Sequence, residues 1–251
     1  MAWVRDVRPM IVAVHQPNYL PYIGFFHKML LADVFVLYDT AQFSKNDFHN
    51  RNRIKTPGGP LWLTIPVRRP TGHAIRDVQA DMSKPWAHDH WEAIRANYAR
   101  AAHFEEFAPE VESAYRKMGR GLAEINRPFI DLISRVLGVR RRIVWASDLP
   151  IPEGLSSSEN LASIVRAVDG DAYLSGPGGV GYLQRAAFEG LAVHLQAFRH
   201  PTYRQLWGEF LPSASALDLV FNMGDEALSV LESWGEARPF PWIDESGRQG
   251  R

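Results

Sequence analysis

The first forty residues alternate between apolar runs and short polar loops. Ile11 to Val14 is a short apolar run, and the two prolines in residues 15–21 prevent a helix there, so a strand followed by a tight loop is expected. Residues 22–32 carry apolar side chains at helical spacing. Residues 34–38 are continuously apolar, which is typical of a parallel sheet covered on both faces. Together they predict a βαβ unit with its loops at the carboxyl edge of the sheet.

The same alternation returns in the second half of the chain. A capping-box sequence begins a helix at Ser156, and helices are also expected near residues 182–189 and 215–234. Residues 39–60 are polar and lack core periodicity, so they predict a loop. Further strands are expected at residues 61–67, 143–146, 172–175 and 191–196.

Helical periodicity fills the middle of the chain. Residues 86–98 and 105–137 predict helices, the second interrupted near Gly119 and Gly121, and together they indicate a helical insertion around residues 85–138. The predicted fold class is therefore α/β: a Rossmann-like, doubly wound, mostly parallel sheet with a helical insertion. A single domain is expected over residues 10–234, with flexible tails at residues 1–9 and 235–251.

Composition narrows the functional classes. The chain has 251 residues, of which 46% are hydrophobic and 22% charged, as in an ordinary globular protein. Lys+Arg and Asp+Glu are both 28, which argues against general nucleic-acid binding. The absence of cysteine excludes disulfides and thiolate chemistry. Charges near the start and the lack of a long apolar run predict a cytoplasmic protein with no membrane span, and a homodimer is compatible with the sequence.

The segment after the first strand is the most informative for chemistry. His15 ends that strand and supplies a proton carrier, and Gln16, Asn18 and Tyr19 add hydrogen-bonding groups in a proline-stiffened loop. Asp39 follows the second strand, so its carboxylate is expected at the same sheet edge, where it could orient His15, act as a base or hold Mg²⁺. A local backbone bond for His15 and a turn bond for Asp39 are the alternatives.

A basic run follows in the polar loop. Alternating placement puts Arg51, Arg53 and Lys55 on one side of an extended segment, where they could hold a phosphate or carboxylate. A solvated surface loop is the alternative reading. The polar neighbours that complete this predicted substrate site are Gln42, Lys45, Asn50 and Asn52.

Two further motifs give weaker signals. The glycine-rich stretch that begins at Ser175 and Gly176 follows a strand, and could present backbone amides to an anion, although a simple strand-to-helix turn is the more frequent reading. His88 and His90 lack the spacing of a helical zinc pair, so no metal site is predicted. The sequence does not identify a cofactor.

The chain resembles the WbqC-like protein family over nearly its whole length. The most specific segment runs from His15 through Lys55, and it contains the sequences His-Gln-Pro-Asn-Tyr-Leu-Pro and Asn-Arg-Asn-Arg-Ile-Lys. Residues 173–177 and 203–224 agree as well. The resemblance implies a role in bacterial surface-polysaccharide or natural-product biosynthesis, and it does not supply a reaction.

A weaker similarity in architecture points to HIGH-motif nucleotidyltransferases and pantothenate-synthetase-like ligases. Those families carry a His-x-Gly-His pair that contacts ATP phosphates. Here the corresponding stretch is Tyr22-Ile23-Gly24-Phe25, so both histidines are absent. This departure argues against ATP activation of that type.

These observations predict a group-transfer enzyme. It would move an acyl, aminoacyl or nucleotidyl-type group from an anionic or nucleotide-linked substrate to a small amino-sugar or natural-product acceptor, with His15 as the general base. The competing hypothesis is a non-catalytic protein that binds a sugar nucleotide or a partner enzyme through the same basic segment. His15 distinguishes the two, because only the enzyme needs a proton carrier.

Overall fold

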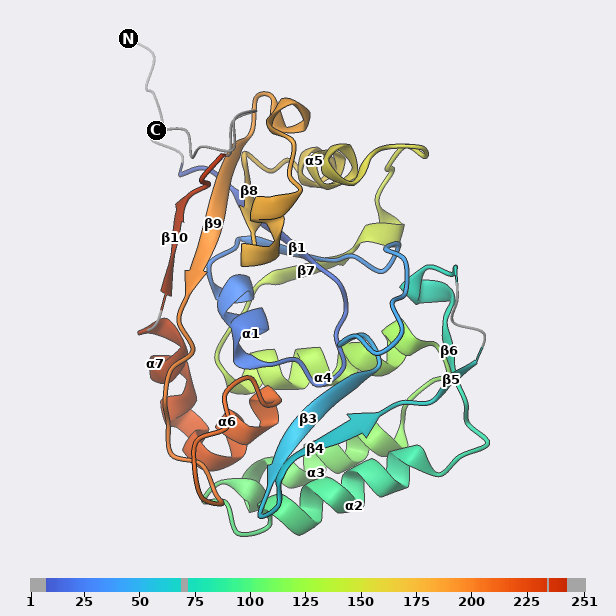
Figure 1. Cartoon of the computed structure of the whole chain (residues 1–251), viewed down its shortest axis with the longest axis vertical. Helices are drawn as coiled ribbons and strands as arrows, with labels where there is room; N and C mark the ends of the chain where they lie inside the picture. The colour runs from blue at the N-terminus through green and yellow to red at the C-terminus, as the bar shows by residue number, and fades with distance from the viewer. Residues whose placement is uncertain (1–7, 69–71, 234, 243–251) are drawn as a thin grey trace.

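A computed structural model describes residues 8–68, 72–233 and 235–242 of the chain, and a six-stranded sheet forms its centre (Figure 1). The strands are ordered β10-β9-β8-β1-β2-β7, and all neighbours pair in parallel except β10, which runs antiparallel to β9. Their bounds are Ile11–His15 (β1), Val34–Leu37 (β2), Arg142–Trp145 (β7), Ala172–Ser175 (β8), Ala192–Phe198 (β9) and Gly235–Pro239 (β10).

The strand order contains a topological switch point. The chain passes from β1 to β2 and β7 on one side, and then resumes at β8 on the other side of β1. Loops that leave β1 and β8 therefore diverge at the carboxyl edge of the sheet, where open α/β folds bind ligands. The predicted Rossmann-like, mostly parallel fold is confirmed.

Helices cover both faces of this sheet (Figure 1). Alternate strand residues such as Ala13, Phe35 and Leu174 pack in one hydrophobic cluster with α1, α4 and α6, whereas Val12 and Val36 pack in another with α5. This division follows from the two-residue period of a strand. The helices are Ile23–Leu30 (α1), Trp86–Tyr98 (α2), Phe104–Arg116 (α3), Leu122–Val136 (α4), Ser157–Ala167 (α5), Ala216–Met223 (α6) and Ala227–Glu232 (α7).

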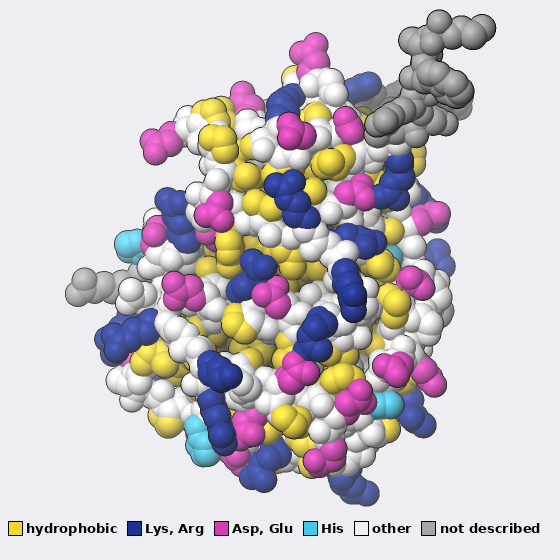
Figure 2. All heavy atoms as spheres, turned by 180° about the vertical axis from the view of Figure 1, so that it is seen from behind, with side chains coloured by type: hydrophobic (Ala, Val, Ile, Leu, Met, Phe, Trp, Pro, Cys, Tyr) yellow, Lys and Arg dark blue, Asp and Glu magenta, His cyan; other side chains and the backbone are white. Residues whose placement is uncertain are grey.

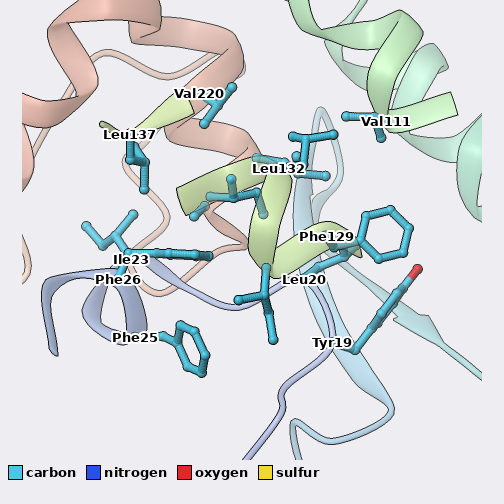
Figure 3. Close-up of a cluster of buried hydrophobic side chains, with 14 of the residues drawn as sticks. Tyr19, Leu20, Ile23, Phe25, Phe26, Val111, Phe129, Leu132, Leu137 and Val220 are labelled. Carbon is cyan, nitrogen blue, oxygen red and sulfur yellow. The ribbon is translucent and has the colours of Figure 1, made fainter. Parts of the chain in front are cut away.

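The larger cluster joins segments that are far apart in the sequence. In Figure 3, Leu20 of the loop after β1, Ile23 and Phe26 of α1, and Leu132 of α4 converge in one apolar region. All four side chains are buried, as is Val220 of α6. The middle helices α2–α4 thus contribute to the main core, because α4 supplies much of the surface against which α1 packs.

Several predicted elements differ in the structure. Most of the basic run lies in β3, Arg51–Thr56, which forms a hairpin with β4, Gly59–Thr64, because the turn between them contains Gly59 at a φ of 100°. Residues 61–64 of the predicted strand therefore belong to this separate hairpin. Val67 lies in β5, Val67–Arg68, which forms a second small sheet with β6, Gln79–Ala80.

The end of the chain also differs. The helix expected near residues 182–189 is replaced by a 3₁₀ turn, Arg185–Phe188 (η4), and another 3₁₀ turn, Pro177–Gly181 (η3), precedes it. The expected tail from residue 235 was wrong for residues 235–239, since β10 pairs with β9 along its whole length. The other expected tail residues, 1–7 and 243–251, lie outside the described residues.

The surface of the protein carries charges of both signs, in agreement with the equal numbers of acidic and basic residues. Figure 2 shows acidic and basic side chains interspersed over the face opposite to that of Figure 1. Among the described residues, no helix is both long and apolar enough to cross a membrane.

Gly170 provides a test of the packing between α5 and β8. A Cβ atom at this position would lie 2.3 Å from Val12 Cγ2 and 2.9 Å from Val165 Cγ1. We expect Gly170→Ala to lower the free energy of unfolding by about 1–3 kcal/mol, because the core must shift to admit the methyl group. Urea denaturation measures this change. Gly181→Ala is the control, since its Cβ would meet nothing within 4 Å, and equal stability of the two variants would contradict the packing argument.

Candidate functional site

A cavity of about 550 Å³ opens at the carboxyl ends of β1 and β8. His15 and Gln16 line it from the end of β1, and Ser175 and Gly176 line it from the end of β8. Tyr22 and Lys28 approach from the side of α1, and residues of α5 approach from the opposite side. The cavity therefore lies at the topological switch point, and we refer to it below as the β1/β8 pocket.

His15 enters this pocket as a neutral imidazole. Its ring packs against Phe25, with 4.8 Å between ring centroids, and against Phe35 on β2. Burial lowers its pKa to about 3, with a further lowering from the charge of Lys28. Nδ1 lies 2.9 Å from the carbonyl oxygen of Gln16, so Nδ1 carries the hydrogen and donates a hydrogen bond to this oxygen. Nε2 is then the unprotonated nitrogen, and it is available to accept a proton from a ligand.

The side chain of Gln16 is fixed by a buried histidine. His49 Nε2 donates to Gln16 Oε1 over 3.0 Å, and the amide of Ser44 donates to His49 Nδ1 over 3.3 Å. Since a backbone amide can only donate, this pair of bonds sets the tautomer of His49. Gln16 therefore presents its amide group to the pocket in a defined orientation.

Lys28 is a pocket residue that was not among the predicted site residues. It lies in α1 and only 4% of its surface is exposed. Its Nζ donates to the carbonyl oxygen of Val14 over 2.8 Å. Burial lowers the pKa of Lys28 to about 7. The signal in the sequence was a lysine within an otherwise apolar helix, Ile-Gly-Phe-Phe-His-Lys-Met-Leu.

Aromatic and amide side chains complete the walls. Tyr22, Tyr38, Tyr173 and Tyr182 all line the pocket. A Cβ atom at Gly24 would lie 2.4 Å from Cε2 of Tyr22, so a larger residue there would displace the tyrosine ring. The amide of Gln196 on β9 also lines the pocket, and donates to the carbonyl of Gly24 and to Nδ1 of the buried His27.

Asp39 is at the same sheet edge but does not orient His15. Both of its carboxylate oxygens accept from Ser147, at 3.0 Å from the backbone amide and 2.7 Å from the hydroxyl. Ser147 follows β7, so Asp39 faces away from β1 and is not among the residues that line the β1/β8 pocket. The expected hydrogen bond between the two residues is therefore wrong, because the turn after β7 supplies two donors to the carboxylate.

Most polar residues of the loop and the basic run also lie outside the pocket. Tyr19 is fully buried, and its hydroxyl bonds His90 and Tyr115. Asn18 is buried, whereas Gln42 and Lys45 are exposed in the segment before β3. The amide of Asn50 donates to the carbonyl of Ile65. None of these side chains is among those that line the pocket.

The three cations of the run have different environments. The guanidinium carbon of Arg51 lies 4.4 Å from the ring centroid of Trp62, and that of Arg53 lies 5.9 Å from it. Lys55 is 97% buried, since only 3% of its surface is exposed. The negative charge of Asp218 opposes the lowering of its pKa by burial. The side chains thus contact protein groups in and beside the β3–β4 hairpin, and they do not line the β1/β8 pocket.

Comparison with known proteins places this site in a family. The profile of the WbqC-like protein family matches residues 16–230. The chain belongs to this family. "Uncharacterized protein Rv1507c" from Mycobacterium tuberculosis (strain ATCC 25618 / H37Rv) is 37% identical over 226 residues, which cover 88% of this chain and 96% of the relative. No solved structure gives a significant match.

Two buried asparagines fix the loop that this WbqC-like protein places after β1. Nδ2 of Asn126, in α4, donates to the carbonyls of Pro17 and His49, both over 2.8 Å. Nδ2 of Asn52, in β3, donates to the carbonyl of Leu20 over 2.6 Å. Leu20 has a φ of 42°, a left-handed conformation that is unfavourable for a leucine and needs such support.

The asparagine contacts give a stability prediction. Asn126→Leu leaves two buried carbonyls without a donor, so the free energy of unfolding should fall by about 2–4 kcal/mol. Chemical denaturation measures the loss. Asn97→Leu is the matched control, because the Asn97 amide donates to the carbonyl of Ala93 in the same helix. If both variants lose equal stability, Asn126 does not hold the loop.

The burial of His15 gives a pH prediction. In the unfolded chain its pKa is near its ordinary value of about 6.5, whereas the folded value is about 3. Between these values the unfolded state binds more protons, so the stability that the neutral ring contributes is lost as the pH falls below about 6.5. Stability measured from pH 7 to 4 should therefore fall less steeply in His15→Gln than in the unsubstituted protein. Substitution of the exposed His73 by Gln should leave the slope of stability against pH unaltered. If His15→Gln shows the same slope as His73→Gln, burial of His15 is not the cause of the pH dependence.

Proposed function

We propose that this WbqC-like protein is a group-transfer enzyme whose anionic or nucleotide-linked substrate binds in the β1/β8 pocket. The observation that carries the proposal is the neutral imidazole of His15 beside the buried amine of Lys28, at the switch point of the sheet. An unprotonated nitrogen and a cation in one pocket are suited to a reaction that removes a proton from an acceptor while it holds a negatively charged donor.

His15 is the general base in this proposal. Nδ1 is occupied by the carbonyl of Gln16, so proton transfer takes place at Nε2. The low pKa in the empty pocket arises first from burial and then from the charge of Lys28. An anionic substrate beside Lys28 offsets that charge, and it therefore raises the basicity of His15 when the substrate is bound.

The reaction class is acyl, aminoacyl or nucleotidyl-type transfer to the amine or hydroxyl of a small acceptor. Gln16 and Gln196 supply oriented amides for substrate recognition, and Ser175 and Gly176 supply polar groups from the opposite strand. The pathway that the family resemblance implies, polysaccharide or natural-product assembly, uses acceptors of this kind.

The test separates turnover from binding. Substrates are first identified by thermal-shift screening with nucleotide sugars, coenzyme A thioesters and aminoacyl nucleotides. His15→Gln keeps hydrogen-bonding capacity and loses proton exchange, so kcat should fall by about 10²-fold while the dissociation constant changes little. His73→Gln, on the exposed surface, should retain full turnover. A normal kcat in His15→Gln would reject His15 as the general base. An equal loss of binding and turnover would favour a non-catalytic binding protein.

A further inference from the structure

We propose that Lys28 binds a phosphate group of a nucleotide in the β1/β8 pocket, beside the loop formed by residues 175–179. This inference rests on the proposed function, because it names the substrate class of the same pocket. The proposed anion contact lies in α1 and not in the basic run of β3.

The sheet itself creates the position that Lys28 occupies. Pairing between β1 and β8 ends at Ala13 and Leu174, so the two strands separate beyond this point. The carbonyl of Val14 accepts from Nζ of Lys28. An ammonium group has three N–H bonds, and the described residues provide an acceptor for one of them. The amine therefore has donors left for a ligand in the pocket.

Among the described residues, the charge of Lys28 has no counter-charge in the pocket. None of the described residues that line the pocket is Asp or Glu, and Lys28 takes part in no ion pair within the described chain. A buried charge without a partner is costly to folding. An anionic ligand that pairs with Lys28 offsets this cost. The ring of His15 is neutral, so it does not compete with the ligand for the positive charge of Lys28.

The neighbouring loop favours phosphate over carboxylate. A Cβ atom at Gly176 would lie 4.0 Å from Nζ, and one at Gly178 would meet nothing within 4 Å, so the backbone of this loop is approachable from the pocket. Backbone that a ligand can approach, together with the point charge of a lysine, is typical of phosphate sites. Ser157, in the first turn of α5, lines the same cavity and adds a hydroxyl.

The tyrosines favour a nucleotide over free phosphate. Tyr38, Tyr173 and Tyr182 line the pocket, and Tyr182 is 52% exposed, so an aromatic face is available to a planar base. The cavity of about 550 Å³ is within the range of small-molecule sites, about 300–1,000 Å³. A phosphate alone would leave most of this space unfilled.

The first experiment compares nucleoside diphosphates with the matching nucleosides. Calorimetric titration of the full chain with ADP, CDP, GDP and UDP at pH 7.5 should show at least one diphosphate that binds about 10-fold or more tightly than its nucleoside. Lys28→Gln keeps an amide donor for the Val14 carbonyl and removes the charge, so this ratio should fall to within about threefold. Lys84→Gln, an exposed lysine outside the pocket, should preserve the ratio. A preserved ratio in Lys28→Gln, or no preference for any diphosphate in the unsubstituted protein, overturns the proposal.

A second measurement needs no variant. The terminal phosphate loses its last proton at about pH 6. Burial raises the pKa of Tyr22, Tyr38, Tyr173 and Tyr182 above its usual value and lowers that of His15, His27 and His49, so none of these groups changes its charge between pH 7.5 and 9.5. The amine of Lys28, whose pKa burial lowers to about 7, loses its remaining charge over this range. Affinity for the diphosphate should fall by about 10-fold between pH 7.5 and 9.5, while affinity for the nucleoside stays constant.

The outcomes distinguish this inference from the proposed function. A flat affinity for the diphosphate across this pH range rejects Lys28 as the phosphate ligand, even if Lys28→Gln fails to fold. The group-transfer proposal is tested separately by the kcat of His15→Gln with any substrate. If His15→Gln loses turnover while the affinity for the diphosphate is independent of pH, the group-transfer proposal stands and the nucleotide proposal is rejected.

Discussion

The pocket depends on how the backbone carbonyls of the loop after β1 are satisfied. This loop must leave the sheet, pass the switch point and enter α1, so its carbonyls cannot pair with a neighbouring strand. Buried asparagine amides from α4 and β3 supply the missing donors at Pro17 and Leu20, and the α4 amide also binds His49, which precedes β3. Because each donor comes from a distant part of the chain, the site is assembled only when the helices and the hairpin have packed.

The buried lysine is a second constraint, and it opposes stability. Nζ of Lys28 caps the Val14 carbonyl where β1 and β8 separate, but burial makes its charged form costly, as its lowered pKa shows. A neutral side chain with one donor would satisfy the same carbonyl at lower cost. Lysine at this position is therefore better explained by ligand binding than by folding, which is the physical basis for assigning it to the pocket.

The sequence predicted the fold better than the site, for reasons that individual residues make clear. Apolar periodicity identified α2 at residues 86–98 and the break between α3 and α4, because these features are local. His15, Gln16, Ser175 and Gly176 were placed at the sheet edge by strand topology alone. Asp39, Asn50 and Asn52 bond a distant serine or backbone carbonyl, and such contacts leave no periodic signal in the sequence. Lys28 was missed for the opposite reason, since its helix reads as apolar.

The two sequences on which the family resemblance rests contact one another. Asn52 in the Asn-Arg-Asn-Arg-Ile-Lys run bonds Leu20 in the His-Gln-Pro-Asn-Tyr-Leu-Pro segment, and Lys55 at the end of that run faces Asp218 in α6. Burial raises the pKa of Asp218 and lowers that of Lys55 even though each favours the charge of the other, so desolvation outweighs their attraction. Tyr98 joins the two by donating to Asp218 and accepting from the amide of Lys55. Asn52 and Lys55 therefore tie β3 to the loop after β1 and to the helical core, which is how residues outside the pocket contribute to its shape.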